Sequence, residues 1–240
     1  MIFQFKKFQV AHDRCAMKVG TDGVLLGAWT PVDFRPNRVL DVGAGSGLIS
    51  LMLAQRTNAL QIDAVEVDEV AFEQCVSNFE NSPWNDRLFC YHATFQELVG
   101  ELYEDEESYD LIISNPPFFE GVGASGVAEE RIQARFNDSL PFEDLLEGAS
   151  LLLNPEGCFS LIIPYSEEEK IIQLASEFHL FPKKITRVKG TVSSKIKRSL
   201  LLFQKNTSPE CVSDELILEV DRHVYTPEFA VLVKDFYLNL

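Results

Sequence analysis

The sequence lacks the marks of a membrane protein, of a disulfide scaffold and of a zinc site. No stretch approaches the roughly 20 apolar residues that cross a bilayer, and no charged segment precedes an apolar run at its start. The five cysteines are odd in number, lie far apart and contain no C-x-x-C pair. We therefore expect a soluble, cytoplasmic protein with no membrane partner and no bound metal.

Positive charge is also scarce. The chain has 21 Lys and Arg against 37 Asp and Glu, and its formal net charge is −16 at pH 7. This balance argues against a protein that coats nucleic acid non-specifically, because binding to phosphates requires a positive surface.

The basic residues that are present are unevenly distributed. Eight of them, and no acid, fall between positions 183 and 205: Lys183, Lys184, Arg187, Lys189, Lys195, Lys197, Arg198 and Lys205. We expect an anionic substrate to bind this basic stretch, above all at Lys195, Lys197 and Arg198. The alternative is that these charges form the solvated face of two edge strands.

Apolar runs of strand length alternate with segments of helical period, which is typical of βαβ units. The runs predict seven strands, at residues 39–42, 62–67, 88–91, 110–114, 159–163, 184–188 and 199–203. Ser46 is expected to cap a helix that ends at Arg56, Asp68 to cap the next, and a third is predicted over 142–153. The fold class is therefore α/β, with a seven-stranded, mostly parallel sheet and helices on both faces.

We expect a single domain with an N-terminal cap segment (1–37), a core (38–205) and a C-terminal extension (206–240).

A glycine-rich turn follows the first strand of the core. It reads D-V-G-A-G-S-G and contains Asp41, Gly43, Gly45 and Gly47. Glycines allow a ligand to approach a main chain that has no Cβ in the way. Leu48 stands where a dinucleotide motif would have its third glycine, so the turn does not suit a pyrophosphate. The carboxylate of Asp41 would repel a phosphate but could hold a positively charged or hydroxyl-rich ligand.

Glu66 ends the second strand of the core, 19 residues after Gly47. This is the usual place for an acid that accepts both hydroxyls of a ribose. With the glycine-rich turn, Glu66 resembles the corresponding motifs of class I methyltransferases. The resemblance implies a Rossmann-like fold, S-adenosylmethionine as cofactor, and the residues of the turn and Glu66 as its ligands. In that class an acid after the third strand often contacts the adenine, and here Thr94 stands in the matching place, so we expect its hydroxyl or a backbone group to substitute.

Asn115, Pro116, Pro117 and Phe118 form an N-P-P-F motif at the end of a buried strand. An amine conjugated to a π system is a poor nucleophile because its lone pair is delocalised. The side-chain carbonyl of Asn115 and the main-chain carbonyl of Pro116 can each accept one N–H and so direct the freed lone pair at a methyl donor. Proline fixes the backbone in advance, and Phe118 can stack on the planar group. The motif predicts methylation of such a nitrogen and is shared by adenine-N6, guanine-N2 and glutamine-N5 methyltransferases.

The segment after this motif carries two arginines, Arg131 and Arg135, four positions apart. If the segment is helical, both lie on one face, and we expect them to bind a phosphate. A lid that orders on substrate and a plain connection are equally open interpretations of the glycines that precede them.

Longer stretches resemble one family, the bacterial tRNA (adenine-N6)-methyltransferases that modify the purine 3′ to the valine-tRNA anticodon. They are residues 5–8, 12–17, 18–27, 82–84, 134–136, 225–226 and 235–238. The resemblance implies that Thr21 and Lys18 cover the cofactor. It also implies a flipped adenine beside the N-P-P-F motif and basic residues that bind the anticodon stem-loop of tRNA.

The leading hypothesis is therefore a tRNA (adenine-N6)-methyltransferase that acts as a monomer. A second hypothesis keeps the mechanism but moves it to a guanine-N2 of rRNA or a glutamine-N5 of a protein. A third is a methyltransferase fold retained as a non-catalytic RNA-binding module. The intact Asp41 and Asn115 favour catalysis over the third hypothesis.

Overall fold

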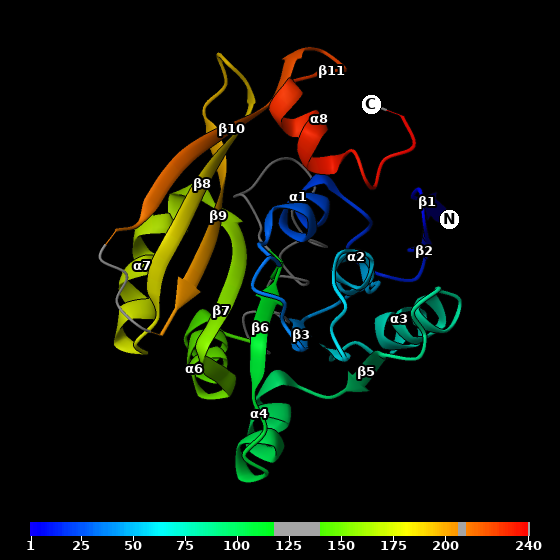
Figure 1. Cartoon of the computed structure of the whole chain (residues 1–240), viewed down its shortest axis with the longest axis vertical. Helices are drawn as coiled ribbons and strands as arrows, with labels where there is room; N and C mark the ends of the chain where they lie inside the picture. Colours follow the sequence, from blue (N-terminus) through cyan, green and yellow to red (C-terminus); the bar gives the residue numbers. More distant parts are fainter. Residues whose placement is uncertain (118–139, 206–209, 240) are drawn as a thin grey trace, which may run out of the picture.

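The computed structural model describes residues 1–117, 140–205 and 210–239. Its centre is a nine-stranded sheet with the strand order β11-β10-β8-β9-β7-β6-β3-β4-β5 (Figure 1). These strands are β3 (Arg38–Val42), β4 (Gln61–Glu66), β5 (Leu88–His92), β6 (Tyr109–Ser114), β7 (Leu153–Pro164), β8 (Phe181–Thr191), β9 (Ile196–Gln204), β10 (Val212–Asp221) and β11 (Val224–Tyr225). The N-terminus adds a separate hairpin of β1 (Ile2–Gln4) and β2 (Gln9–Ala11).

All seven predicted strands are present, but the count of seven for the sheet was too low. The chain after position 209 contributes β10, which pairs in parallel with β8, and β11, which pairs with β10. Two acids of β10 pair with lysines of β8, since Lys184 Nζ lies 3.6 Å from Asp214 Oδ2 and Lys189 Nζ lies 2.8 Å from Glu215 Oε2. The basic strands are therefore interior, and the alternative of two edge strands is wrong.

The parallel strands end at one edge of the sheet, which we call the carboxyl edge. β3 pairs in parallel with β4 and β6, and β6 pairs in parallel with β7. β9 runs antiparallel between β7 and β8, with Pro164 opposite Arg198. The turn between β8 and β9, which contains Lys195, therefore lies at the carboxyl edge together with the glycine-rich turn and Asn115.

Helices cover both faces of the sheet because side chains of successive strand residues alternate between two hydrophobic clusters. In β3, Val39 belongs to one cluster and Leu40 to the other. The first cluster is covered by α1 (Thr21–Trp29), α2 (Leu48–Arg56), α3 (Glu69–Glu80) and α8 (Pro227–Val233). The second is covered by α4 (Phe95–Glu104), α6 (Phe142–Leu152) and α7 (Glu168–Glu177).

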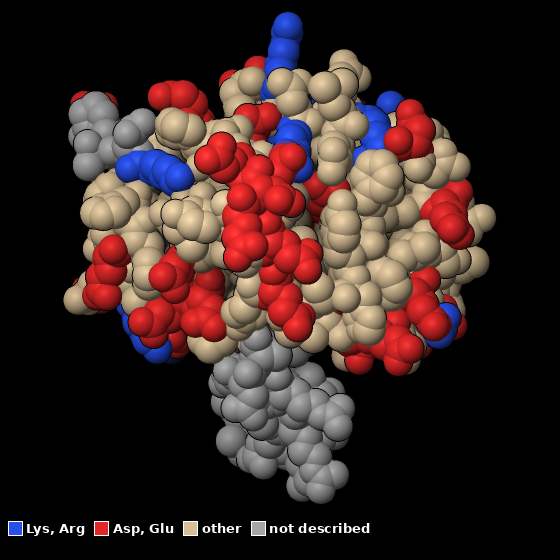
Figure 2. All heavy atoms as spheres, turned by 90° about the horizontal axis from the view of Figure 1, so that it is seen from below, with Lys and Arg blue, Asp and Glu red and all other residues tan. Residues whose placement is uncertain are grey.

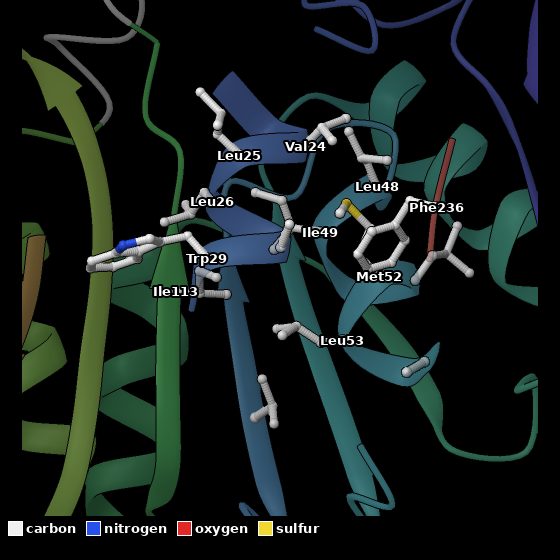
Figure 3. Close-up of a cluster of buried hydrophobic side chains, with 14 of the residues drawn as sticks. Val24, Leu25, Leu26, Trp29, Leu48, Ile49, Met52, Leu53, Ile113 and Phe236 are labelled. Carbon is white, nitrogen blue, oxygen red and sulfur yellow. The ribbon is translucent and has the colours of Figure 1, made fainter. Parts of the chain in front are cut away.

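The first cluster joins N-terminal and C-terminal segments of the chain to α2. Figure 3 shows Leu26 and Trp29 of α1, Met52 of α2 and Phe236 of the C-terminal tail around one core. A Cβ on Gly27 would lie 2.8 Å from Met52 Sδ, so this glycine permits the close approach of α1 to α2. The main-chain N–H of Lys6 donates to the carbonyl of Phe236 at 2.9 Å, which ties the N-terminal segment to the tail.

Two predicted helix caps had different outcomes. Asp68 caps α3 as predicted, because its carboxylate accepts the N–H of Ala71 at 2.8 Å. The prediction of Ser46 as the cap of α2 was wrong, since the capping residue is Gly47 in the left-handed conformation with φ of 76°. The turn requires a left-handed residue at Gly47. Ser46 instead accepts a hydrogen bond through its main-chain carbonyl, from Asn78 Nδ2 at 2.8 Å.

Candidate active site

The glycine-rich turn connects β3 to α2 at the carboxyl edge. Gly43, Gly45 and Gly47 all have positive φ, with values of 71°, 55° and 76°. A Cβ on Gly43 or Gly45 would meet no heavy atom within 4 Å, whereas one on Gly47 would lie 2.5 Å from Phe79 Cε1. Gly43 and Gly45 therefore line open space suited to a ligand, while Gly47 lets α3 pack beneath the turn.

Glu66 holds the glycine-rich turn in place from the end of β4. Its Oε2 accepts the N–H of Gly45 at 2.8 Å, and its Oε1 accepts the N–H of Asp68 at 2.9 Å. The side chain is only 4% exposed, and burial raises its pKa above the usual value. Glu66 lines a hollow at this edge of the sheet.

Asp41 presents a buried oxygen that has no partner within the described residues. Its Oδ2 accepts the main-chain N–H of Ser50 at 3.1 Å and the hydroxyl of Ser50 at 2.7 Å. Its Oδ1 is buried and unpaired in that part of the chain, and burial raises the pKa of the carboxyl to about 6. A buried carboxylate with a free acceptor attracts an ammonium group, such as that at the amino-acid end of S-adenosylmethionine.

A hollow runs from the glycine-rich turn toward the start of α4. Its wall includes Gly43, Glu66, Thr94 and Leu140 together with Val42, Val65, Val67, Ala93 and Phe95. The apolar members form a slot of the kind that a planar heterocycle enters, and Glu66 supplies acceptors at one side of it. The residues present therefore fit an adenosine with a charged amino-acid tail.

Thr94 is at the predicted place, but its polar groups are already engaged. It caps α4, because its hydroxyl accepts the N–H of Glu97 at 3.2 Å and donates to Glu97 Oε2 at 2.7 Å. Its own N–H donates to the same carboxylate at 2.9 Å. An adenine in the hollow would meet Thr94 chiefly through van der Waals contact.

Asn115 follows β6 and lies beside the glycine-rich turn. Ser114 is the register partner of Val42, and its hydroxyl donates to the carbonyl of Val42 at 2.9 Å. Asn115, Pro116 and Pro117 are half-buried at the rim of the carboxyl edge. Phe118 and the arginines at 131 and 135 lie outside the described residues.

The start of α1 and the segment before it approach Asn115. Asn115 Nδ2 lies 4.0 Å from Met17 Sδ, and a Cβ on Gly23 would lie 3.7 Å from the same nitrogen. His12 orders this segment, because its Nδ1 accepts the N–H of Val19 at 2.8 Å. Sequence reasoning did not assign Met17 or His12 to the site, and the only signal for them was their place in the stretch at 12–17.

The two predicted cofactor residues of this segment are not part of the first hollow. Lys18 is exposed, and Thr21, the first residue of α1, lines a second hollow that is formed with residues of β8, β10, β11 and α8. The prediction that Thr21 covers the cofactor therefore receives no support from its position.

Half of the basic stretch is neutralised by acids. Lys184, Lys189, Arg187 and Arg198 form ion pairs with Asp214, Glu215, Glu168 and Asp22, respectively. Lys195 and Lys197 are exposed at the carboxyl edge. Of the three cations singled out above, these two lysines are the ones available to a phosphate in this structure.

The opposite edge of the sheet is acidic. Figure 2 shows this edge from below, with Asp and Glu side chains crowded across it. They include the exposed carboxylates at the end of α4 and in the loop that follows: Glu101, Glu104, Asp105, Glu106 and Glu107. A polyanion is repelled from this face.

Neither a membrane span nor a metal cluster is found in the described residues. Within those ranges no helix is long and apolar enough to cross a membrane. In the same part of the chain, no three His, Cys, Asp or Glu side chains gather as a metal ion would require.

Comparisons with known proteins match this geometry. The family model for the methyltransferase small domain matches residues 20–163, which contain both the glycine-rich turn and Asn115. A tRNA1(Val) (adenine(37)-N6)-methyltransferase of Flavobacterium psychrophilum is 58% identical over 239 residues, with 100% of each chain covered. The protein of the same name from Bacteroides thetaiotaomicron is 43% identical over 239 residues, covering 99% of this chain and 98% of that protein.

Solved structures agree on the fold. A predicted O-methyltransferase of Agrobacterium tumefaciens has a TM-score of 0.71 at 22% identity, covering 90% of this chain and 96% of that one. A ribosomal protein L11 methylase of Lactobacillus delbrueckii has a TM-score of 0.51 at 18% identity, with 77% of each chain covered. The prediction of a Rossmann-like α/β methyltransferase fold is confirmed.

Proposed function

The chain belongs to the methyltransferase small domain family and, within it, to the tRNA1(Val) (adenine(37)-N6)-methyltransferases, and on this premise we propose that it methylates N6 of adenine 37 in a tRNA anticodon loop. S-adenosylmethionine is the methyl donor. The observation that carries the proposal is the juxtaposition of Asn115 with the glycine-rich turn, through the register of β6 on β3. This register supports the proposal because it brings the end of β6 beside the turn that follows β3.

Asp41, Gly43, Gly45 and Glu66 are the residues that we propose to hold the cofactor, which supplies an electrophilic methyl group on a sulfonium when bound. The unpaired Oδ1 of Asp41 would accept from the ammonium group. Gly43 and Gly45 leave room along the main chain, and Glu66 would accept from the ribose hydroxyls. We propose that Gly47 contributes through the packing of the turn, and that Lys18, Thr21 and Thr94 contribute at most van der Waals contact.

Asn115 and Pro116 are proposed to bind the reacting amine. Each would accept one N–H of the adenine N6 group, through the side-chain carbonyl of Asn115 and the main-chain carbonyl of Pro116. With both N–H bonds directed at acceptors, the nitrogen lone pair is withdrawn from the ring and aimed at the donor. Pro117 would keep this backbone rigid, and Phe118 would stack on the extruded base.

For tRNA binding we propose Lys195 and Lys197 at the turn between β8 and β9, assisted by Arg131 and Arg135. The anticodon stem-loop would lie across the carboxyl edge, away from the acidic face. We propose that the chain acts as one domain, because β10 and β11 extend the same sheet as the core strands, and as a monomer in the cytoplasm.

Methylation of total bacterial tRNA with labelled cofactor, followed by digestion to nucleosides, tests the proposal. The label is expected in N6-methyladenosine. Label in a guanosine derivative, or label that stays on protein after RNase treatment, would instead support one of the two alternative enzyme hypotheses. Absence of any binding of S-adenosylhomocysteine by calorimetry would support the non-catalytic module.

A further inference from the structure

A second hollow lies at the carboxyl edge, beyond the site described so far. Its empty volume, including its open mouth, is about 560 Å³. The wall is built from five helices and strands together with the C-terminal tail. The lining residues are Thr21 of α1, Gly190 of β8, Leu218 and Glu219 of β10, Tyr225 of β11, Phe229 of α8, and Tyr237 of the tail. Figure 1 shows these C-terminal elements standing over the start of α1.

The aromatic side chains of this hollow are held by neighbours. Tyr225 packs edge-on against Phe229, with ring centroids 4.9 Å apart, and Tyr237 stacks near Phe5 at 6.2 Å. Thr226 fixes the turn between β11 and α8, since its N–H donates to the carbonyl of Leu218 at 2.9 Å. Tyr225 nevertheless remains 37% exposed, so a face of a prepositioned ring is accessible to a ligand.

The charge of the hollow selects the kind of ligand. Glu219 is a half-buried carboxylate in the wall, and no ion pair of it is found in the described residues, although Asp214 and Glu215 on the same strand both pair with lysines. A carboxylate repels a phosphate but accepts from the exocyclic amino group of a nucleobase. An aromatic ring beside such an acceptor is the usual arrangement for an unpaired base in RNA recognition.

Two exposed lysines beside this hollow, Lys195 and Lys197, are available to bind an RNA backbone. Lys189 is the register partner of Ile196, so Lys195 and Lys197 flank the strand end that carries Gly190. Gly23, which approaches Asn115, is two residues along α1 from Thr21 in the wall. At 1.5 Å of rise per residue, these two positions of α1 are about 3 Å apart along the helix axis, which brings the hollow within the reach of nucleotides that neighbour the target.

We propose that this hollow binds an unpaired nucleobase adjacent to the methylated adenine. The base stacks on Tyr225 and donates an N–H of its exocyclic amino group to Glu219. Cytosine, adenine and guanine offer an amino group for this contact, whereas uracil does not. The hollow is thus a specificity site for the sequence that flanks the target, and the inference rests on the proposed function.

Methylation kinetics on a synthetic anticodon stem-loop test the proposal. The bases next to the target adenine are replaced one at a time by uracil. For the wild-type protein, one replacement is expected to raise KM on the order of tenfold with little change in kcat. Glu219→Ala should abolish this discrimination, Tyr225→Ala should raise KM for the unaltered RNA on the order of tenfold, and Tyr225→Phe should restore it.

Matched controls are the exposed Glu104→Ala and Tyr103→Ala on α4, at the acidic edge, which should leave KM unchanged. If the Glu219 and Tyr225 variants behave like these controls, the hollow does not bind the RNA and the proposal is overturned. The wild-type protein reports separately on the proposed function through its yield of N6-methyladenosine. Fluorescence anisotropy with the same RNAs measures base discrimination even if no methylated product forms.

Discussion

Nε of Arg198 donates to Oδ2 of Asp22 at 2.9 Å, which joins the start of β9 to the first turn of α1. The two residues are 176 positions apart in the chain. Both side chains are largely shielded from solvent, with exposures of 21% and 32%. Arg198 therefore positions the segment beside Asn115, and its charge is not free for a phosphate.

Arg198 and Lys197 are accordingly expected to respond differently to substitution. Lys197→Ala should weaken tRNA binding and lower the slope of log K against log salt concentration by about 0.7 to 0.9, as the loss of one phosphate contact requires. Arg198→Ala should instead lower the free energy of unfolding by up to about 1 kcal/mol. Filter binding across a salt series and chemical denaturation measure the two effects, and an unchanged salt slope for Lys197→Ala would exclude that contact.

Asn115→Ala is expected to abolish turnover and leave the affinity for S-adenosylhomocysteine within a few-fold. The side chain is proposed to act on the reacting nitrogen and not on the cofactor, so its removal should affect kcat. Calorimetry and single-turnover kinetics on the same sample provide the measurement. A parallel loss of cofactor affinity would show that its role is misassigned.

The raised pKa of Asp41 predicts that the stability of the ligand-free protein depends on pH. Its pKa in the folded state, about 6, lies above the ordinary value of 3.8, so its contribution to stability is fully present below about pH 4 and is lost as the pH rises through about 6. The loss amounts to about 3 kcal/mol. Urea denaturation from pH 4 to 7.5 should show this fall in the wild-type protein and a flatter profile in Asp41→Asn.

The same carboxylate should control cofactor affinity in the opposite sense. Protonation below about pH 6 removes the charge that attracts an ammonium group, so S-adenosylhomocysteine should bind more weakly at pH 5 than at pH 7.5. In Asp41→Asn, affinity should be low and nearly independent of pH. Wild-type affinity that does not change over this range would contradict the assignment of Asp41.

Gly45→Ala tests the proposed cofactor contact of the glycine-rich turn, and Gly47→Ala tests the packing of that turn against α3. At Gly45 the added methyl group meets no protein atom, so the cost to stability is about 1 kcal/mol of backbone strain, while cofactor affinity should fall strongly. At Gly47 the methyl group would overlap Phe79 and Cys75, so the free energy of unfolding should fall by about 2 to 4 kcal/mol. Thermal melts with and without S-adenosylhomocysteine distinguish the two outcomes.

Local signals predicted much of the fold, and their failures have physical causes. The strand at 212–221 fell within the predicted extension because acids interrupt its apolar pattern, yet two of them, Asp214 and Glu215, pair with lysines of β8. Ser46 was preferred as a cap on propensity, but the turn needed a left-handed residue at Gly47. In both cases a long-range partner outweighed the local preference.

The candidate site was likewise only partly predictable from the sequence. The order and spacing of Asp41, Glu66 and Asn115 were sufficient to predict a cofactor turn and an amine-binding motif, because each follows a strand and parallel strands end at one edge. The spacing of Thr94 and Glu97 is that of a capping box, so their contact is encoded locally although it was not predicted. Nothing local indicated that Thr21 would face a second hollow, because that depends on which elements pack around the start of α1.

By itself, the amino-acid sequence determined the strands of the core, the chemistry of the D-V-G-A-G-S-G and N-P-P-F motifs, and the class of reaction, because these depend on residues close together in the chain. Only the tertiary structure decided which cations remain free for RNA and where the second hollow forms. Ion pairs such as Arg198 with Asp22 and the convergence of five elements around Glu219 join residues far apart in the chain, and no local pattern encodes such contacts.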